Sequence, residues 1–324
     1  MPRRAHTEPT PSKTSRRGVR CARRRPRTAH APDGATRADT TFGAAPQPRF
    51  APDFAARLLV VLLPLGLCGC LLARTQVVRL PERHSVETER LLILSDVRLS
   101  LQHPLVTDLQ QLQQRITHEL QLPDGERQVV VYLFGDEDAY RRYLRTAYPS
   151  LPPRRAYFVG TADELAVFTF WGDRIREDLR HEFTHGLLHA ALRNVPLWLD
   201  EGLAEYFEVV PSDAGTPVHT EYIGELLDAV RRGWRPDLRR LEGLHDVAEM
   251  HRRDYAEAWA WVHFFLNGSD EHRAAMLDYL LELRDSAHPP AFSQRLPNDA
   301  RSWNNRLLAF LVREYQRLHR ERHG

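Results

Sequence analysis

Residues 181–185 read His-Glu-Phe-Thr-His, and their types and spacing could assemble a metal centre. On a helix, His181 and His185 lie one turn apart on one face, with about 6 Å between their Cβ atoms, so both imidazoles can reach the same ion. Glu182 lies about 100° further around the helix, where its carboxylate can reach a water held by the ion rather than the ion itself. A zinc ion would lower the pKa of that water to about 7, and the carboxylate would accept its proton as the water attacks a carbonyl group.

The residues around this pentapeptide predict the helix that such a site needs. Within residues 174–193, Ile175, Leu179, Phe183 and Leu187 recur every four positions and form an apolar stripe. The two histidines fall on the opposite side, so the helix can pack one face and present the histidines on another. The alternative interpretation is a pair of helix histidines that fill space or hydrogen-bond locally.

A third ligand is expected downstream, because catalytic zinc takes three protein ligands and leaves one position for water. His189 continues the row along the same helix and is predicted to pack or to support a ligand rather than to bind. Pro196 suits the first turn of a second helix over residues 197–207. Glu201 and Glu205 share one face of that helix, so one carboxylate can bind zinc while the other holds a ligand histidine by its free ring N–H. A solvated acidic pair is the alternative, and it fits poorly with the apolar residues that flank both positions.

The combination of HEFTH with WLDEGLAEYF at residues 198–207 resembles the gluzincins, the thermolysin-like and aminopeptidase-like zinc peptidases, and most closely the bacterial peptidase MA-like domains. The resemblance implies that Glu201 is the third zinc ligand and that Glu205 orients a histidine ligand. It also implies that Tyr255, at the start of a later apolar helix, stabilises the oxyanion of the reaction. The other interpretation of Tyr255 is a half-buried aromatic residue at a helix start. The 15 residues between the second histidine and Glu201 are fewer than in better-known gluzincins, so a tight turn must join the two helices.

The segment upstream of the metal helix bears on the kind of cleavage. The aminopeptidases of this family carry a Gly-Ala-Met-Glu-Asn-like strand that recognises a free amino terminus, and this sequence has no such segment. Residues 156–160 and 164–170 predict two strands joined by a turn. The resemblance implies that the second strand binds the substrate backbone by strand addition, and the alternative is an ordinary edge strand. The pattern favours an endopeptidase.

The beginning of the chain predicts the compartment. Residues 1–53 form a basic leader, rich in Pro, Ala and Thr, that cannot bury a core. Residues 54–70 contain an apolar run that is shorter than the roughly 20 residues of a membrane span and has the length of a signal-peptide core. The run ends in Leu-Cys-Gly-Cys, which resembles a bacterial lipobox and implies lipidation of Cys70. An uncleaved signal anchor is the alternative. In either case we expect the following domain to face the periplasm or the outside of a bacterial cell envelope.

Charge and cysteine content limit the partners of that domain. The three cysteines are Cys21, Cys68 and Cys70, so the domain has neither disulfides nor a thiolate zinc site. The net charge of +2 conceals a division, because residues 1–70 carry 13 basic and 4 acidic side chains whereas residues 71–324 carry 32 and 39. We therefore expect no nucleic-acid partner for the domain. The expected partners are a peptide or protein substrate and, through the lipid or signal anchor, a membrane.

Hydrophobic periodicity predicts an α+β fold in which a small mixed β-sheet lobe, residues 71–173, precedes a mostly helical lobe, residues 174–324. The HExxH helix lies between them, as the gluzincin plan implies. Besides the elements above, the expected strands are residues 91–94 and 128–134, and the expected helices are residues 104–120, 136–147, 220–232, 255–266, 271–283 and 300–320.

Two classes of function fit these features. The first is a zinc-dependent peptidase, exported and membrane-tethered, in which Glu182 activates water. The second is a lipoprotein that keeps the fold and binds zinc or peptide without turnover. The glutamate of the motif favours the enzyme, because a binding module needs no base at that position. A DNA-binding role of the basic leader would require the leader to stay attached and cytoplasmic.

Overall fold

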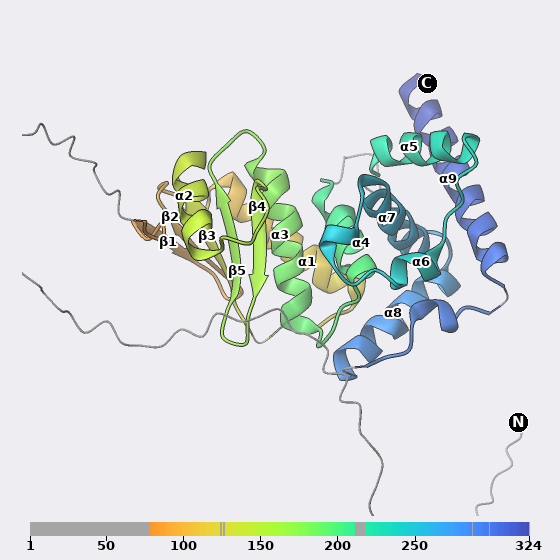
Figure 1. Ribbon diagram of the computed structural model, residues 1–324, viewed down its shortest axis with the longest axis horizontal. Coiled ribbons are helices and arrows are strands. Elements are labelled where there is room, and N and C mark those ends of the chain that lie inside the picture. Colours follow the sequence, from red (N-terminus) through yellow and green to blue (C-terminus); the bar gives the residue numbers. More distant parts are fainter. Residues whose placement is uncertain are drawn as a thin grey trace, which may run out of the picture. The chain divides into compact units, whose positions relative to one another are not determined.

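The structure is a computed structural model that describes residues 78–123, 125, 127–210, 218–286, 288–297 and 299–323 (Figure 1). The predictions for the basic leader, the apolar run and Cys70 lie outside these residues. These described residues belong to one compact unit. Among the described residues, no helix is both long and apolar enough to cross a membrane.

A five-stranded mixed sheet forms the first part of this unit. Its strands lie in the order β1-β2-β3-β5-β4, with β2, β3 and β5 parallel and the two outer strands antiparallel to their neighbours. The apolar runs of β3 and β5 are buried almost throughout, as expected for central strands covered on both faces. The strands are β1 (His84–Glu87), β2 (Leu91–Ser95), β3 (Val129–Phe134), β4 (Ala156–Gly160) and β5 (Leu165–Phe170).

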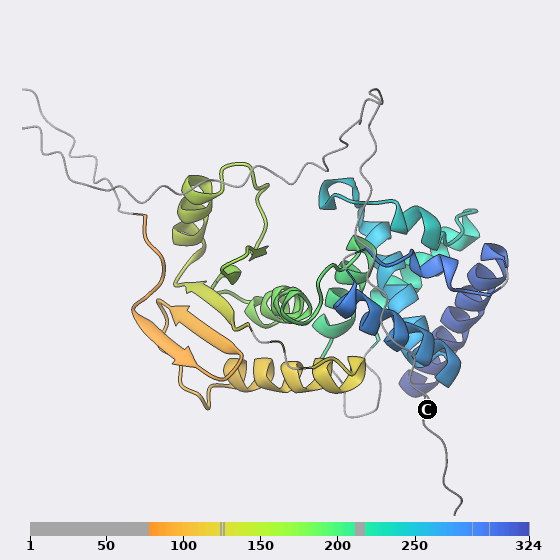
Figure 2. The same cartoon turned by 90° about the horizontal axis from the view of Figure 1, so that it is seen from below.

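Helices cover both faces of the sheet (Figures 1 and 2). On one face, α2 (Glu137–Ala147) packs its buried Tyr140 and Leu144 against aromatic residues of β3 and β5. On the other face lie α1 (Pro104–Leu120) and α3 (Ile175–Ala191), which bury the aliphatic side chains of the same strands. The alternation of aromatic and aliphatic side chains along each strand therefore separates two apolar layers.

The sheet order corrects one expectation. The strand predicted over residues 164–170 is β5, and it pairs with β3 along one edge and with β4 along the other. Because both of its edges are hydrogen-bonded, β5 cannot add a substrate strand. Among the described residues, the free edge next to α3 belongs to β4, which packs against that helix. The local pattern located both strands but carried no information on their order.

The second part is helical and is organised around α7 (Arg252–Asn267), which is buried along nearly its whole length. It packs against α4, α5, α8 and α9. The fold class is thus confirmed as mixed α+β, with a small mixed sheet and a mostly helical part. Strand β1, helix α6 and two short 3-10 turns were not predicted. The further helices are α4 (Leu197–Glu208), α5 (Thr220–Arg231), α6 (Leu238–Glu242), α8 (Asp270–Asp285) and α9 (Ala300–His323), and the turns are Val247–Glu249 and Phe292–Gln294.

Two glycines let the site helices approach their neighbours closely. A Cβ on Gly186 of α3 would lie 2.7 Å from a methyl of Val129 in β3. A Cβ on Gly202 of α4 would lie 2.7 Å from the carbonyl oxygen of Ala258 in α7. A short link joins α3 and α4, since α3 ends at Ala191 and α4 begins at Leu197, which confirms the tight connection. The two glycines thus fix how deeply each site helix sits in the fold.

Candidate metal centre

Arg180 holds the two site helices in place. Its guanidinium is buried and donates to the carbonyls of Phe207 and Glu208 at the end of α4, at 2.8 and 2.9 Å. It also pairs with Asp108 of α1 at 3.1 Å. The side chain therefore ties α1, α3 and α4 together directly beside His181. Phe183 is fully buried on the side of α3 opposite the two histidines, as its place in the apolar stripe predicts.

The structure brings together the three side chains predicted as metal ligands. Glu201 Oε2 lies 3.5 Å from His181 Nε2 and 3.7 Å from His185 Nε2. One donor atom from each of the three residues lies within 4.8 Å of the others. In a tetrahedral zinc site with bonds of 2.0–2.1 Å, neighbouring donor atoms are about 3.4 Å apart. The donor set and its spacing therefore fit zinc, whose presence stays a prediction.

A second carboxylate lies behind each histidine. Asp200 Oδ1 is 2.9 Å from His185 Nδ1, an ion-pair contact in which the N–H is not well aligned with the oxygen. The other oxygen of Asp200 lies 2.9 Å from His189 Nε2. His189 thus contacts the carboxylate behind His185 and is not one of the three proposed ligands. Glu208 Oε2 lies 3.1 Å from His181 Nδ1. Carboxylates in this position orient a ligand ring and raise its basicity.

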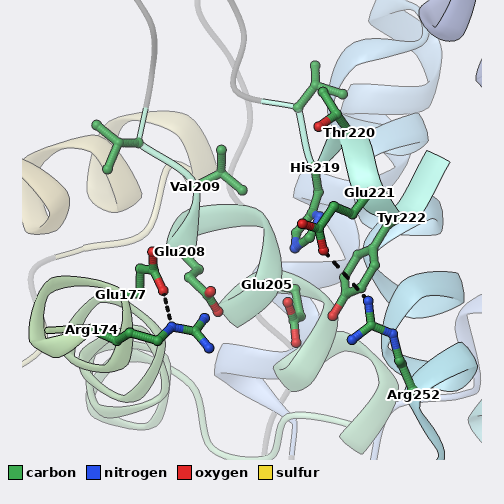
Figure 3. Close-up of a pocket in the computed structure, with 12 residues that line it drawn as sticks. Arg174, Glu177, Glu205, Glu208, Val209, His219, Thr220, Glu221, Tyr222 and Arg252 are labelled. Atoms are coloured by element: carbon green, nitrogen blue, oxygen red, sulfur yellow. Dashed lines mark hydrogen bonds and ion pairs between the residues drawn. The ribbon is translucent and has the colours of Figure 1, made fainter. Parts of the chain in front are cut away.

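No sequence motif points to Asp200 or Glu208 as supporting residues, and the family resemblance implies that role for Glu205. In the structure Glu205 interacts with the hydroxyl of Tyr222 on α5 and with the charge of His181, and its role in orienting a ligand stays a prediction. Figure 3 shows Glu205 and Glu208 side by side on α4, facing the same hollow. Glu208 is seven positions after Glu201, so it lies on the face of α4 that also carries Glu201 and Glu205. This spacing, although not a motif, is the sequence signal that indicates Glu208 as a site residue. Glu205 is one donor of a second potential cluster with His181 and Glu208.

The charges of the cluster favour a bound cation. Burial alone would lower the pKa of His185, but Asp200 and Glu201 outweigh it and raise that pKa to about 9. Burial likewise opposes protonation of His181, and its contacts with Glu201 and Glu208 raise its pKa well above the ordinary value. Both imidazoles are thus held in an anionic environment, which a divalent ion would neutralise.

Glu182 lies between the cluster and the sheet edge. Burial raises the pKa of its carboxyl group, and the charges of His181 and His185 oppose the increase. The backbone N–H of Phe158 on β4 donates to it. Glu182 is half-buried and lines the hollows on both sides of the cluster. It is placed next to the proposed ligands without being one of them, as the motif predicts.

Tyr255 lies in the first turn of α7 and lines the same hollow as His181 and Glu182. Burial and the charge of Glu201 raise the pKa of its hydroxyl, and the neighbouring Arg154 opposes the increase. The structure therefore places this hydroxyl at the cluster, while its role in a reaction stays a prediction. No sequence motif points to Arg154, which comes from the loop before β4.

Three neighbouring hollows form one cleft across the cluster. The apolar hollow, about 490 Å³, lies beside Leu151, Tyr157, Phe158 and Leu197. The central hollow, about 480 Å³, shares His181, Glu182 and Arg154 with it. The acidic hollow, about 750 Å³, continues from the central one past Glu205 and Glu208 and is the one drawn in Figure 3. The cluster thus lies along the cleft rather than at its closed end.

No family model matches the chain, and no curated protein is similar to it at a significant level. The chemical interpretation therefore depends on the residues and geometry of the site.

Proposed function

We propose that this chain is a zinc-dependent peptidase of the gluzincin type. The observation that carries the proposal is the convergence of His181, His185 and Glu201 at separations that suit tetrahedral zinc, with Glu182 beside them. Two imidazoles and one carboxylate are the donor set of catalytic rather than structural zinc sites, because they leave a position open.

The side chains around the cluster supply the remaining parts of a hydrolytic site. A zinc ion, when bound, would polarise a peptide carbonyl and make water more acidic. Glu182 accepts a proton from the attacking water and passes it to the departing amine. Tyr255 donates a hydrogen bond to the carbonyl oxygen as negative charge develops on it. Asp200 and Glu208 hold the two histidine rings in orientation.

The cleft supports cleavage within a chain rather than trimming of an amino terminus. The hollows extend from the cluster in two directions, so a peptide can continue past both sides of the scissile bond. Among the described residues, the outer edge of β4 lies beside Glu182 and is not paired with another strand, so it can bind an extended substrate in place of β5. Both features favour an endopeptidase.

Export and tethering complete the proposal and rest on sequence alone. The apolar run and the Cys70 lipobox suggest a lipoprotein of the bacterial envelope. Mass spectrometry of the native amino terminus decides this: a lipid-modified Cys70 is expected, and an intact leader would contradict it. Cys70→Ser should abolish the modification, whereas Cys68→Ser should not.

The decisive experiment combines metal analysis with a peptide library. The full chain, purified in detergent, should contain one zinc ion per molecule and should cleave peptides until the zinc is removed by a chelator. Glu182→Gln should retain the zinc and lose hydrolysis by about 10⁴-fold or more. A protein that holds stoichiometric zinc and cleaves no peptide would instead be the binding lipoprotein. A protein that binds no zinc contradicts both.

A further inference from the structure

Arg154 is a firmly placed cation at the mouth of the cleft. The buried Tyr140 of α2 donates its hydroxyl hydrogen bond to the Arg154 carbonyl at 3.1 Å. The Tyr157 hydroxyl binds the carbonyl of Pro152 in the same loop. The backbone on both sides of the residue is thus anchored to the sheet and its helix, while the side chain is exposed and lines both the apolar and the central hollow.

The other arginines near the cleft are engaged with carboxylates. Arg174 lies 2.6 Å from Glu177, and Arg252 lies 2.9 Å from Glu225. Arg155, the next residue in the chain, is paired with both Asp173 and Asp178, at 3.2 and 3.0 Å.

Arg154 differs from these arginines, since within the described part of the chain it forms no ion pair with an Asp or Glu. Its neighbours are the Tyr255 hydroxyl, the Tyr157 ring and, at longer range, the charge of Glu201. A guanidinium has five N–H donors in a planar fork, so most of its capacity to bind a carboxylate remains available.

The pairing of the arginines differs along the cleft. The acidic hollow contains four glutamates, and its two arginines are paired with glutamates. The apolar hollow also contains four carboxylates, but those of Asp200 and Glu201 face the candidate ligand histidines. Arg154 lies at this end, above apolar walls that reduce the competing effect of water on a charged pair. Among the described arginines that line the cleft, Arg154 is therefore the one that can bind an anionic group without giving up an ion pair, and it is next to the candidate metal centre.

We propose that Arg154 is a specificity-determining residue that binds a carboxylate of the peptide substrate close to the scissile bond. The proposal rests on the peptidase function proposed above. The carboxylate has two possible sources, the side chain of an Asp or Glu residue or the free carboxyl terminus of the peptide. Bidentate contact with the guanidinium would position either one.

Matched fluorogenic peptides test this with the full-length zinc-loaded protein. One pair differs only in Glu against Gln beside the cleaved bond, and a second pair differs only in a free acid against an amide at the carboxyl terminus. We expect the carboxylate member of one pair to have a kcat/KM about 10- to 100-fold higher, and the pair that shows the preference identifies the source. Arg154→Met should remove the preference, so that kcat/KM falls about 10- to 100-fold more for the carboxylate member than for the neutral one. Any loss that arises from the contact of Arg154 with the Tyr255 hydroxyl is common to both members.

Two further variants sharpen the result. Arg154→Glu should reverse the preference in favour of a Lys-containing peptide. Arg141→Met, which removes one exposed positive charge from α2, should leave the preference unchanged. Equal loss of activity towards both members of each pair in Arg154→Met would overturn the proposal, because the side chain would then act on the reacting carbonyl group. Equal cleavage of both members of every pair by the wild-type protein would also overturn it.

A binding measurement separates this proposal from the peptidase function. Fluorescence anisotropy with the Glu182→Gln protein compares the Kd values of the same labelled peptides without turnover. Tighter binding of the carboxylate member that is lost in Glu182→Gln/Arg154→Met supports the proposal even if the wild-type protein hydrolyses nothing. Hydrolysis by the wild-type protein together with equal Kd values for both members contradicts the role of Arg154 and leaves the peptidase function standing.

Discussion

Asp200 Oδ1 lies 2.9 Å from His185 Nδ1, so the carboxylate stands behind the ring while Nε2 faces Glu201. Glu201, which follows Asp200 in the chain, therefore lies on the opposite side of the same imidazole. Consecutive residues of α4 contact the two nitrogens of one ring, because that ring projects from α3 onto the first turn of α4. This arrangement fixes which nitrogen is available to an ion.

Replacement of Asp200 by Asn should weaken zinc binding by about 10- to 100-fold, because the amide cannot stabilise positive charge on the ring of a bound His185. Competition with a chromogenic chelator measures the affinity. His189→Gln is the matched control, since it removes only the outer contact of Asp200 and should leave the affinity close to wild type. Equal affinities of Asp200→Asn and wild type would show that the carboxylate does not support the site.

Glu208, rather than Glu205, should be the carboxylate that supports His181. Glu208→Gln is expected to lower zinc affinity by about tenfold or more, because it weakens the 3.1 Å contact with Nδ1. Glu205→Gln should have a smaller effect, since Glu205 interacts with Tyr222. The same chelator competition compares the two variants under identical conditions. The opposite ranking would restore the role that the family resemblance implied for Glu205.

The periodicity of the sequence located the site helices, because apolar spacing and the Pro196 start depend on short segments of chain. The HExxH motif indicated His181 and His185, and the resemblance to the gluzincins implied Glu201. Residues whose roles depend on how separate elements meet were missed. Glu208 reaches His181 only because α4 crosses α3 at one particular depth, and Arg154 reaches the cleft only because its loop is tied to α2. The position of β5 inside the sheet is likewise a property of strand order.

Gly202 should be intolerant of a side chain. Gly202→Ala places a methyl 2.7 Å from the Ala258 carbonyl oxygen, so α4 must move away from α7. We expect the free energy of unfolding to fall by about 1–3 kcal/mol, together with weaker zinc binding, because Glu201 moves with the helix. Urea denaturation of the metal-free protein measures the first effect.

Gly224→Ala is the control for this substitution. Gly224 lies within α5, and a Cβ there meets nothing within 4 Å. Alanine should stabilise the protein by about 0.5–1 kcal/mol, because it restricts the unfolded chain and favours the helix. If both variants changed stability in the same direction, close packing between α4 and α7 would not explain the effect at Gly202.

The ion pair between Asp108 and Arg180 should make stability depend on pH in the acid range. Burial alone would raise the pKa of Asp108, but hydrogen bonding to Arg176 and the charge of Arg180 outweigh it and lower the pKa below its ordinary value of 3.8. Because the folded-state pKa is the lower one, the contribution is fully present above pH 3.8 and is lost as the pH falls through the folded-state value.

Asp108→Asn should therefore lower the free energy of unfolding by about 3 kcal/mol at pH 7, since it leaves the buried Arg180 without its carboxylate. Urea denaturation of the metal-free proteins should show a nearly constant difference from pH 8 to 5 and a shrinking difference below pH 3.8. Arg141→Met, which breaks an exposed pair with Glu137, should change stability by less than about 0.5 kcal/mol at every pH. A difference between wild type and Asp108→Asn that grows as the pH falls would mean that Asp108 is destabilised, not stabilised, as an anion in the folded protein.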